Sequence, residues 1–123
     1  MTSSPVIHRE DDVTVVEFGQ DFDSIGEDRI DAVANVLTQV VPDEGSGVVI
    51  DLSHTSFFGS SFIEQLFRLW NRMKKEGQGR FAICGLQPYC REVLEVTNLH
   101  HLWILTDTRE EAIRKVKEVG DDD

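Results

Sequence analysis

The sequence predicts a single α/β domain, residues 1–123, with about four helices and a mixed, mostly parallel sheet that a β-hairpin opens. Short apolar or β-branched runs alternate with amphipathic segments of helical spacing, which is typical of this class. The length of 123 residues suits one ordinary domain, and no internal repeat or Pro/Gly/Ser-rich linker divides the chain. We expect the polar ends, residues 1–4 and 120–123, to be flexible.

The opening hairpin is predicted by two β-branched runs, residues 6–9 and 13–18, on either side of a short acidic turn. A helix should follow, because apolar residues recur there at helical spacing: Ile30, Val33, Ala34, Leu37 and Val41. Residues 42–47, with proline and two glycines, end that helix. Residues 48–52 form a continuous apolar run, typical of a strand buried on both faces.

The clearest helix comes next and ends in the glycine-containing segment 74–79. Its broad apolar stripe consists of Phe62, Ile63, Leu66, Phe67, Leu69, Trp70 and Met73. Residues 80–86 and 102–106 predict two further strands, with a helix at about residues 89–96 between them. The last helix opens with a cap-like Asp-Thr pair and carries Ala112, Ile113, Val116 and Val119 on one face.

Strands that alternate with helices imply right-handed crossovers and parallel pairing. We expect the central strands to contain Val15, Val49, Ile50, Ala82, Ile83 and Ile104. In open sheets of this kind, functional residues lie at the carboxyl ends of the strands. The turn at residues 57–61, Phe-Phe-Gly-Ser-Ser, is expected at such an end.

Charge and composition exclude several function classes. A net charge of −11 argues against nucleic acid and anionic lipid as partners. No apolar run approaches the length of a membrane span, and the N-terminus lacks the pattern of a signal peptide. We therefore expect a cytoplasmic location, with Cys84 and Cys90 as reduced thiols.

The motifs of enzymes, metal sites and cofactor sites are not found in the sequence. The histidines, His8, His54, His100 and His101, have no metal-ligand spacing. No Walker lysine and no G-x-G-x-x-G is present. The Gly-Ser-Ser turn lacks the G-x-S-x-G spacing of a hydrolase, since position 62 is phenylalanine. We predict no catalytic residue, no metal and no cofactor; an enzyme that uses Ser60, or Cys90 activated at a helix start, is the minority hypothesis.

The two serines of the turn have different predicted roles. Ser61 and Glu64 fit the capping box S-x-x-E, which assigns Ser61 to the helix N-cap and leaves Ser60 free of the helix. Phe58 and Phe62 flank the serines and suit an apolar surface that binds a partner. Phe57 and Phe58 are adjacent, so one of them is expected in the core, and the sequence leaves open whether Phe62 faces solvent.

The stretch VVIDLSHTSFFGSSFIEQLFRL resembles the strand–turn–helix of the STAS domain, the fold of bacterial anti-sigma factor antagonists. Asp51, Leu52 and Ser53 match the Asp-Leu-Ser that ends the family's strand. Ser60 matches the phosphorylatable serine, Ser61 the residue after it, and Ile63 the apolar residue of the helix. Upstream, Phe22-Asp23 stands in the family's Leu-Asp place, and residues 80–113 are similar to its second half.

The resemblance implies an anti-sigma factor antagonist that acts by partner switching. It would bind an anti-sigma factor that is itself a serine kinase, and a PP2C-like phosphatase would reset it. The implied phosphorylation site is Ser60, with Ser61 as the alternative. The implied partner-binding residues are Asp23, Phe58, Gly59, Ser60, Ser61 and Phe62. The oligomeric state is left open.

Two departures from the family's pattern favour an alternative. Gly59 replaces an acidic residue before the serine, and Phe62 replaces a small glycine after the serine pair. The alternative is a STAS module that is not phosphorylated and that serves as a scaffold, in a stressosome-like or lipid-transport complex.

Overall fold

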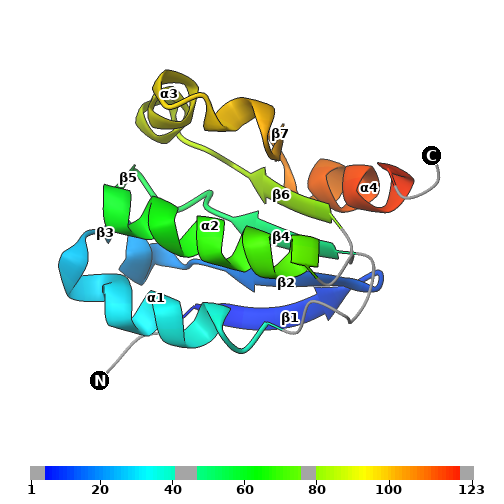
Figure 1. Cartoon of the computed structure of the whole chain (residues 1–123), viewed down its shortest axis with the longest axis horizontal. Coiled ribbons are helices and arrows are strands. Elements are labelled where there is room, and N and C mark those ends of the chain that lie inside the picture. The colour runs from blue at the N-terminus through cyan, green and yellow to red at the C-terminus, as the bar shows by residue number, and fades with distance from the viewer. Residues whose placement is uncertain (1–4, 41–46, 76–79, 120–123) are drawn as a thin grey trace.

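A computed structural model describes residues 5–40, 47–75 and 80–119 and contains a five-stranded sheet in the order β1-β2-β4-β6-β7 (Figure 1). The strands are β1 (Val6–Glu10), β2 (Val13–Glu17), β4 (Gly47–Asp51), β6 (Arg80–Cys84) and β7 (Ile104–Thr106). β1 is antiparallel to β2, and every other pair of neighbours is parallel. The predicted mixed sheet with its opening hairpin is confirmed.

Four α-helices are found in the described residues: α1 (Ile30–Leu37), α2 (Ser60–Lys75), α3 (Pro88–Val96) and α4 (Arg109–Val119). α1 and α2 lie side by side on one face of the sheet, while α4 packs on the other face against β6, β4 and β7 (Figure 1). The expected cap of the last helix is confirmed, because Thr108 Oγ1 accepts a hydrogen bond of 3.1 Å from the Glu111 amide. None of the helices described is long and apolar enough to span a membrane.

Alternation along the strands divides the core in two. Val48 and Ile50 belong to the larger cluster under α1 and α2, whereas Val49 between them belongs to the cluster under α4. Of the residues predicted in central strands, Val15, Val49, Ile50, Ala82 and Ile83 are fully buried. The prediction is wrong for Ile104, which is half-buried because β7 is an edge strand.

Several boundaries differ from the prediction because short irregular turns adjoin the elements. α1 ends at Leu37, before the turn that carries the buried Val40. The last strand starts at Ile104, because a 3₁₀ turn, η3 (Leu99–His101), occupies the residues before it. Val41, the Val119 side chain and both chain ends, residues 1–4 and 120–123, lie outside the described residues.

The sequence did not predict a second, two-stranded sheet. β3 (Ser24–Ile25) pairs in parallel with β5 (Phe57–Phe58). In the chain, β3 lies between the 3₁₀ turns η1 (Gln20–Phe22) and η2 (Glu27–Arg29), and β5 lies just before the start of α2. Strands this short have no readable periodicity. This small sheet holds the turn that carries the two serines.

Candidate functional site

The turn before α2 is fixed to the segment that precedes α1. The Ser56 amide donates to the Asp23 carbonyl at 2.8 Å, and the Ser56 hydroxyl donates to Asp23 Oδ1 at 2.8 Å. The Gly59 amide donates to the Ile25 carbonyl at 3.1 Å. Asp23, one of the predicted partner-binding residues, therefore lies against this turn.

The start of the same turn rests on the Asp51 carboxylate, at the end of β4. Asp51 Oδ1 accepts hydrogen bonds from the Ser53 amide at 3.0 Å and the Ser53 hydroxyl at 2.6 Å. Asp51 Oδ2 accepts from Arg109 Nε at 3.0 Å and Nη2 at 2.8 Å. Arg109, at the start of α4, also pairs with Glu10 at 2.7 Å and Glu17 at 3.2 Å. One carboxylate thus joins the turn to α4 and, through Arg109, to the hairpin.

The protonation of this cluster follows from its contacts. Burial alone would raise the pKa of Asp51, but the Ser53 hydrogen bonds and Arg109 outweigh it and hold the pKa below its ordinary value. Glu10 shows the same balance: burial opposes the shift, and the bonds to His8 and Arg109 lower its pKa. Both carboxylates are therefore charged at neutral pH.

Both cysteines are buried and have free thiols. Burial raises the pKa of the Cys84 thiol to about 12, with the Asp51 charge adding to the effect. Burial also raises the pKa of the Cys90 thiol to about 11, although Cys90 lies in the first turn of α3. The helix start therefore does not activate Cys90, and its thiol is protonated at neutral pH.

Ser60 and Ser61 differ in their surroundings. Ser60 is exposed, and within the described part of the chain its hydroxyl has no hydrogen-bond partner. Ser61 is half-buried and donates a hydrogen bond of 2.8 Å to Glu27 Oε2 in η2. The hydroxyl of Ser60 is thus available to another molecule, whereas that of Ser61 ties α2 to η2.

The predicted capping box is wrong. α2 already begins at Ser60, because the Gly59 carbonyl accepts from the Phe62 amide at 3.1 Å. Ser61 therefore lies inside the first turn, and its hydroxyl finds the Glu27 carboxylate instead of a backbone amide. The expected partner, Glu64, pairs with Arg68 at 2.8 Å.

The predicted aromatic surface needs correction at Phe58 and Phe62. Phe58 is 2% exposed and Phe62 fully buried, with ring centroids 5.2 Å apart. Phe62 faces the sheet from the first turn of α2, so neither ring offers contact area. The exposed aromatic pair is instead Phe57, 39% exposed, stacked on Tyr89, 49% exposed, at 5.6 Å. Because successive side chains of β5 point to opposite faces, Phe58 is buried and Phe57 is exposed. No pattern in the sequence indicated that Tyr89 would be part of an exposed aromatic pair.

The remaining predicted residues gather at the start of α2: Asp23, Gly59, Ser60 and Ser61. A Cβ atom on Gly59 would meet nothing within 4 Å, so this glycine is not required by packing. Among the residues the structure describes, no three His, Cys, Asp or Glu side chains group as a metal site would need.

A family model described as STAS domain matches residues 4–112. The chain is similar to the structure of an anti-sigma-factor antagonist (STAS) domain protein from Planctomyces limnophilus, with 37% identity over 94% of this chain and 99% of that one, and a TM-score of 0.84.

Two further solved structures are similar. The first is an anti-sigma factor antagonist from Mycobacterium paratuberculosis, with 26% identity, 93% of each chain covered and a TM-score of 0.78. The second, the Bacillus cell fate determinant SpoIIAA in its phosphorylated form, shares the fold with 16% identity over 92% of this chain and 99% of that one, at a TM-score of 0.68. No curated protein sequence matches the chain.

Proposed function

Since the chain belongs to the STAS domain family, we propose that it is an anti-sigma factor antagonist that acts by partner switching. In its unphosphorylated form it binds an anti-sigma factor that is also a serine kinase. Phosphorylation of Ser60 ends this binding, and a PP2C-like phosphatase restores it. The protein acts in the cytoplasm as a substrate and a switch, and catalyses no reaction itself.

The contrast between the two serines carries the proposal. Ser60 presents an exposed hydroxyl at the first residue of α2. The Ser61 hydroxyl lies 2.8 Å from the Glu27 carboxylate, so a phosphate on Ser61 would be repelled by the negative charge of Glu27. This contrast favours Ser60 over the alternative, Ser61, as the phosphorylation site.

The helix start accommodates a phosphate on Ser60. The N-terminal end of a helix carries a partial positive charge and free amides, which favour an anion. The first turn of α2 contains no acidic residue of its own, and the Glu27 carboxylate beside it is bonded to Ser61. Phosphorylation therefore leaves the domain folded. At an interface, by contrast, the phosphate adds nearly two negative charges that a partner would have to desolvate.

Exposed groups around Ser60 supply the contact area for the partner. Phe57 lies in β5, shortly before Ser60 in the chain, and its ring stacks on Tyr89 of α3. Asp23 is also exposed, and its hydrogen bond with Ser56 holds it beside the same turn. The partner-binding surface proposed here consists of Asp23, Phe57, Gly59, Ser60 and Tyr89, with the buried Phe58 and Phe62 beneath it.

Binding of charge variants to the partner kinase tests the proposal. Ser60→Asp should weaken binding by at least about tenfold relative to Ser60→Ala, because an unpaired charge at a desolvated surface costs several kcal/mol. Thr108→Asp is the matched control, since it adds the same charge at another exposed helix start, that of α4. Equal binding of both aspartate variants would reject the switch.

The scaffold alternative, in a stressosome-like or lipid-transport complex, rests on Gly59. The family carries an acid at this position, and a side chain there would meet no neighbour within 4 Å. Gly59→Asp should therefore fold normally and speed phosphorylation of Ser60 if the kinase reads that acid. A wild-type chain that is not phosphorylated, together with unchanged binding of Ser60→Asp, would favour the scaffold.

A further inference from the structure

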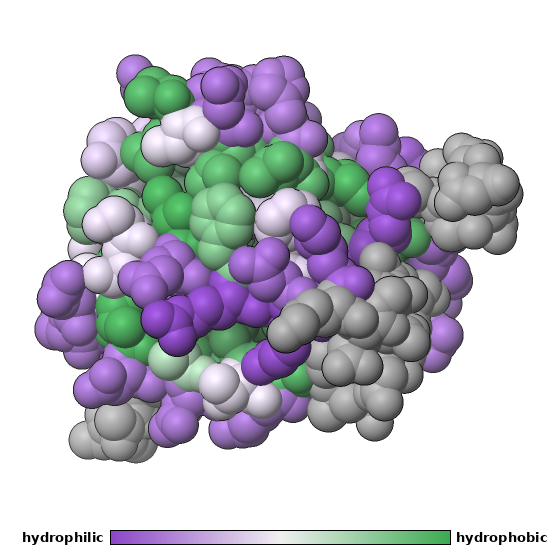
Figure 2. Space-filling view, viewed as in Figure 1, coloured by the Kyte–Doolittle hydropathy of each residue, from purple (hydrophilic) through white to green (hydrophobic). Residues whose placement is uncertain are grey.

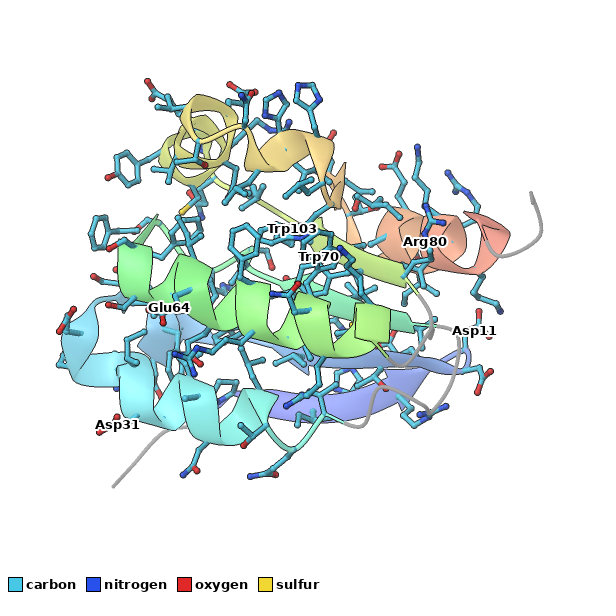
Figure 3. The ribbon with its side chains drawn as sticks, in the orientation of Figure 1. Asp11, Asp31, Glu64, Trp70, Arg80 and Trp103 are labelled. Carbon is cyan, nitrogen blue, oxygen red and sulfur yellow. The ribbon has the colours of Figure 1, made fainter. Side chains whose placement is uncertain are left out.

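A hollow of about 310 Å³ lies at the end of α2 that is remote from Ser60. The C-terminal turn of α2, the start of β6 and the residues before β7 surround it. Figure 3 shows Trp70 and Trp103 lying together beside α2, with Arg80 farther along toward α4. Its walls contain the apolar side chains of Trp70, Met73, Phe81 and Leu102 and the cations Lys74 and Arg80.

The walls are apolar and held in place by aromatic packing. Trp103, only 4% exposed, packs edge-on against Trp70 at 6.2 Å and against Phe81 at 5.2 Å between ring centroids. Leu102 is 45% exposed at the mouth. The hydrophobic residues of this face gather in a band between α2 and the α3–β7 segment (Figure 2). The hollow is thus preformed, and open to solvent on one side.

The charge at the hollow differs from the charge of the whole protein. The chain has 23 acidic and 12 basic residues. Yet Lys74 and Arg80 both line this hollow, and neither has an ion pair with any carboxylate among the described residues. The Lys74 ammonium lies 4.3 Å from the centre of the Trp70 ring. By contrast, Arg72, in a smaller hollow nearby, already donates to the Leu37 and Val40 carbonyls.

We propose that this hollow binds a small amphiphilic carboxylate, with its acyl chain against Trp70 and Phe81 and its carboxylate held by Lys74 and Arg80. The 310 Å³ volume is at the lower end for small-molecule sites. It suits a chain of on the order of ten carbons, taking about 30 Å³ for each water-sized group. Burial of the chain supplies affinity, and charge-assisted hydrogen bonds to the two cations select the anion.

Decanoate is the probe, and the protein supplies its own reporter. The chain has two tryptophans: Trp70 lines the hollow, and the buried Trp103 packs directly against Trp70 and Phe81 of its wall. Titration of the full-length protein with decanoate, below its micelle concentration, should give a saturable change in tryptophan fluorescence. Both indole N–H signals should shift in the NMR spectrum of the wild-type protein.

Charge variants and a neutral ligand complete the test. Lys74→Glu and Arg80→Glu should each weaken decanoate binding about tenfold or more, whereas Lys115→Glu, an equal change at an exposed position of α4, should have less than a twofold effect. Decanol should bind about tenfold more weakly than decanoate. Thermal melts identify a variant that fails to fold, and the NMR shifts of the wild type do not depend on any variant.

The proposal would be overturned by a fluorescence change that does not saturate, by indole signals that stay in place, or by decanol binding as tightly as decanoate. Wild-type affinity in folded Lys74→Glu and Arg80→Glu would also overturn it. Since the hollow and Ser60 lie at opposite ends of α2, none of these results bears on partner switching.

Discussion

Replacing Arg109 with methionine should destabilise the domain far more than replacing an exposed arginine. The substitution keeps an unbranched chain but leaves the Asp51 carboxylate, whose side chain is 8% exposed, without its cation. Removing one partner of a buried ion pair costs roughly 3–5 kcal/mol. Arg109 itself is 25% exposed, so water can partly replace it, and we expect a loss of about 2–3 kcal/mol.

Arg68→Met is the matched control. The Arg68–Glu64 pair has the same N–O distance as the Arg109–Asp51 pair, 2.8 Å, but its side chains are 70% and 58% exposed. An exposed pair one helical turn apart contributes about 0.3–0.5 kcal/mol. The two pairs therefore match in N–O distance, and they differ in burial and in the number of carboxylates that the arginine contacts.

Urea denaturation, followed by tryptophan fluorescence, measures the free energy of unfolding of each variant. A double-mutant cycle with Asp51→Asn isolates the pair, and we expect a coupling energy above about 1 kcal/mol. Equal losses for Arg109→Met and Arg68→Met, or a coupling energy near zero, would show that Asp51 does not depend on Arg109.

Three further predictions concern the same end of the sheet. Ser61→Ala should cost about 1 kcal/mol in urea denaturation, because it removes a hydrogen bond to a carboxylate, and Ser60→Ala much less; the reverse order would contradict the roles given to the two serines. Gly85→Ala should lower stability by more than about 1–2 kcal/mol, since Gly85 has a φ of +75° and an added Cβ would lie 2.7 Å from a serine Cβ. Gly19→Ala is the control, because a Cβ there would meet nothing within 4 Å. Equal losses of stability in the two variants would show that position 85 does not require glycine. Because folding lowers the pKa of Asp51, the ionised carboxylate contributes to stability at neutral pH, and this contribution is lost as the pH falls through about 4 and below. Asp51→Asn should therefore lose less stability than the wild type between about pH 5 and 2. Parallel curves of unfolding free energy against pH for the two proteins would contradict this.

Much of the fold could be predicted because the strongest signals in the sequence are those of burial. The continuous apolar runs around Val49 and Ile83 become central strands, and the apolar stripe of α2 covers the sheet. The Thr108 cap was also readable, because a hydroxyl before an acidic first turn has few other roles. These features depend on local composition and periodicity alone.

The site was less predictable because it depends on contacts between distant segments. Ser61 fits a capping box in sequence, but Glu27, which is far from it in the chain, competes for its hydroxyl once β3 and β5 pair. Phe62 reads equally well as core or surface, since only the orientation of the first turn of α2 determines which way it points. The Asp51–Arg109 pair joins two elements that no local pattern relates.

Intact-mass analysis after incubation with the partner serine kinase and ATP shows whether Ser60 is the residue that is phosphorylated. We expect one added phosphate on the wild-type chain and on Ser61→Ala, and none on Ser60→Ala, with fragmentation placing the phosphate on Ser60. A phosphate retained by Ser60→Ala, or a wild-type chain left unmodified by a kinase that it binds, would contradict the claim that Ser60 is the switch.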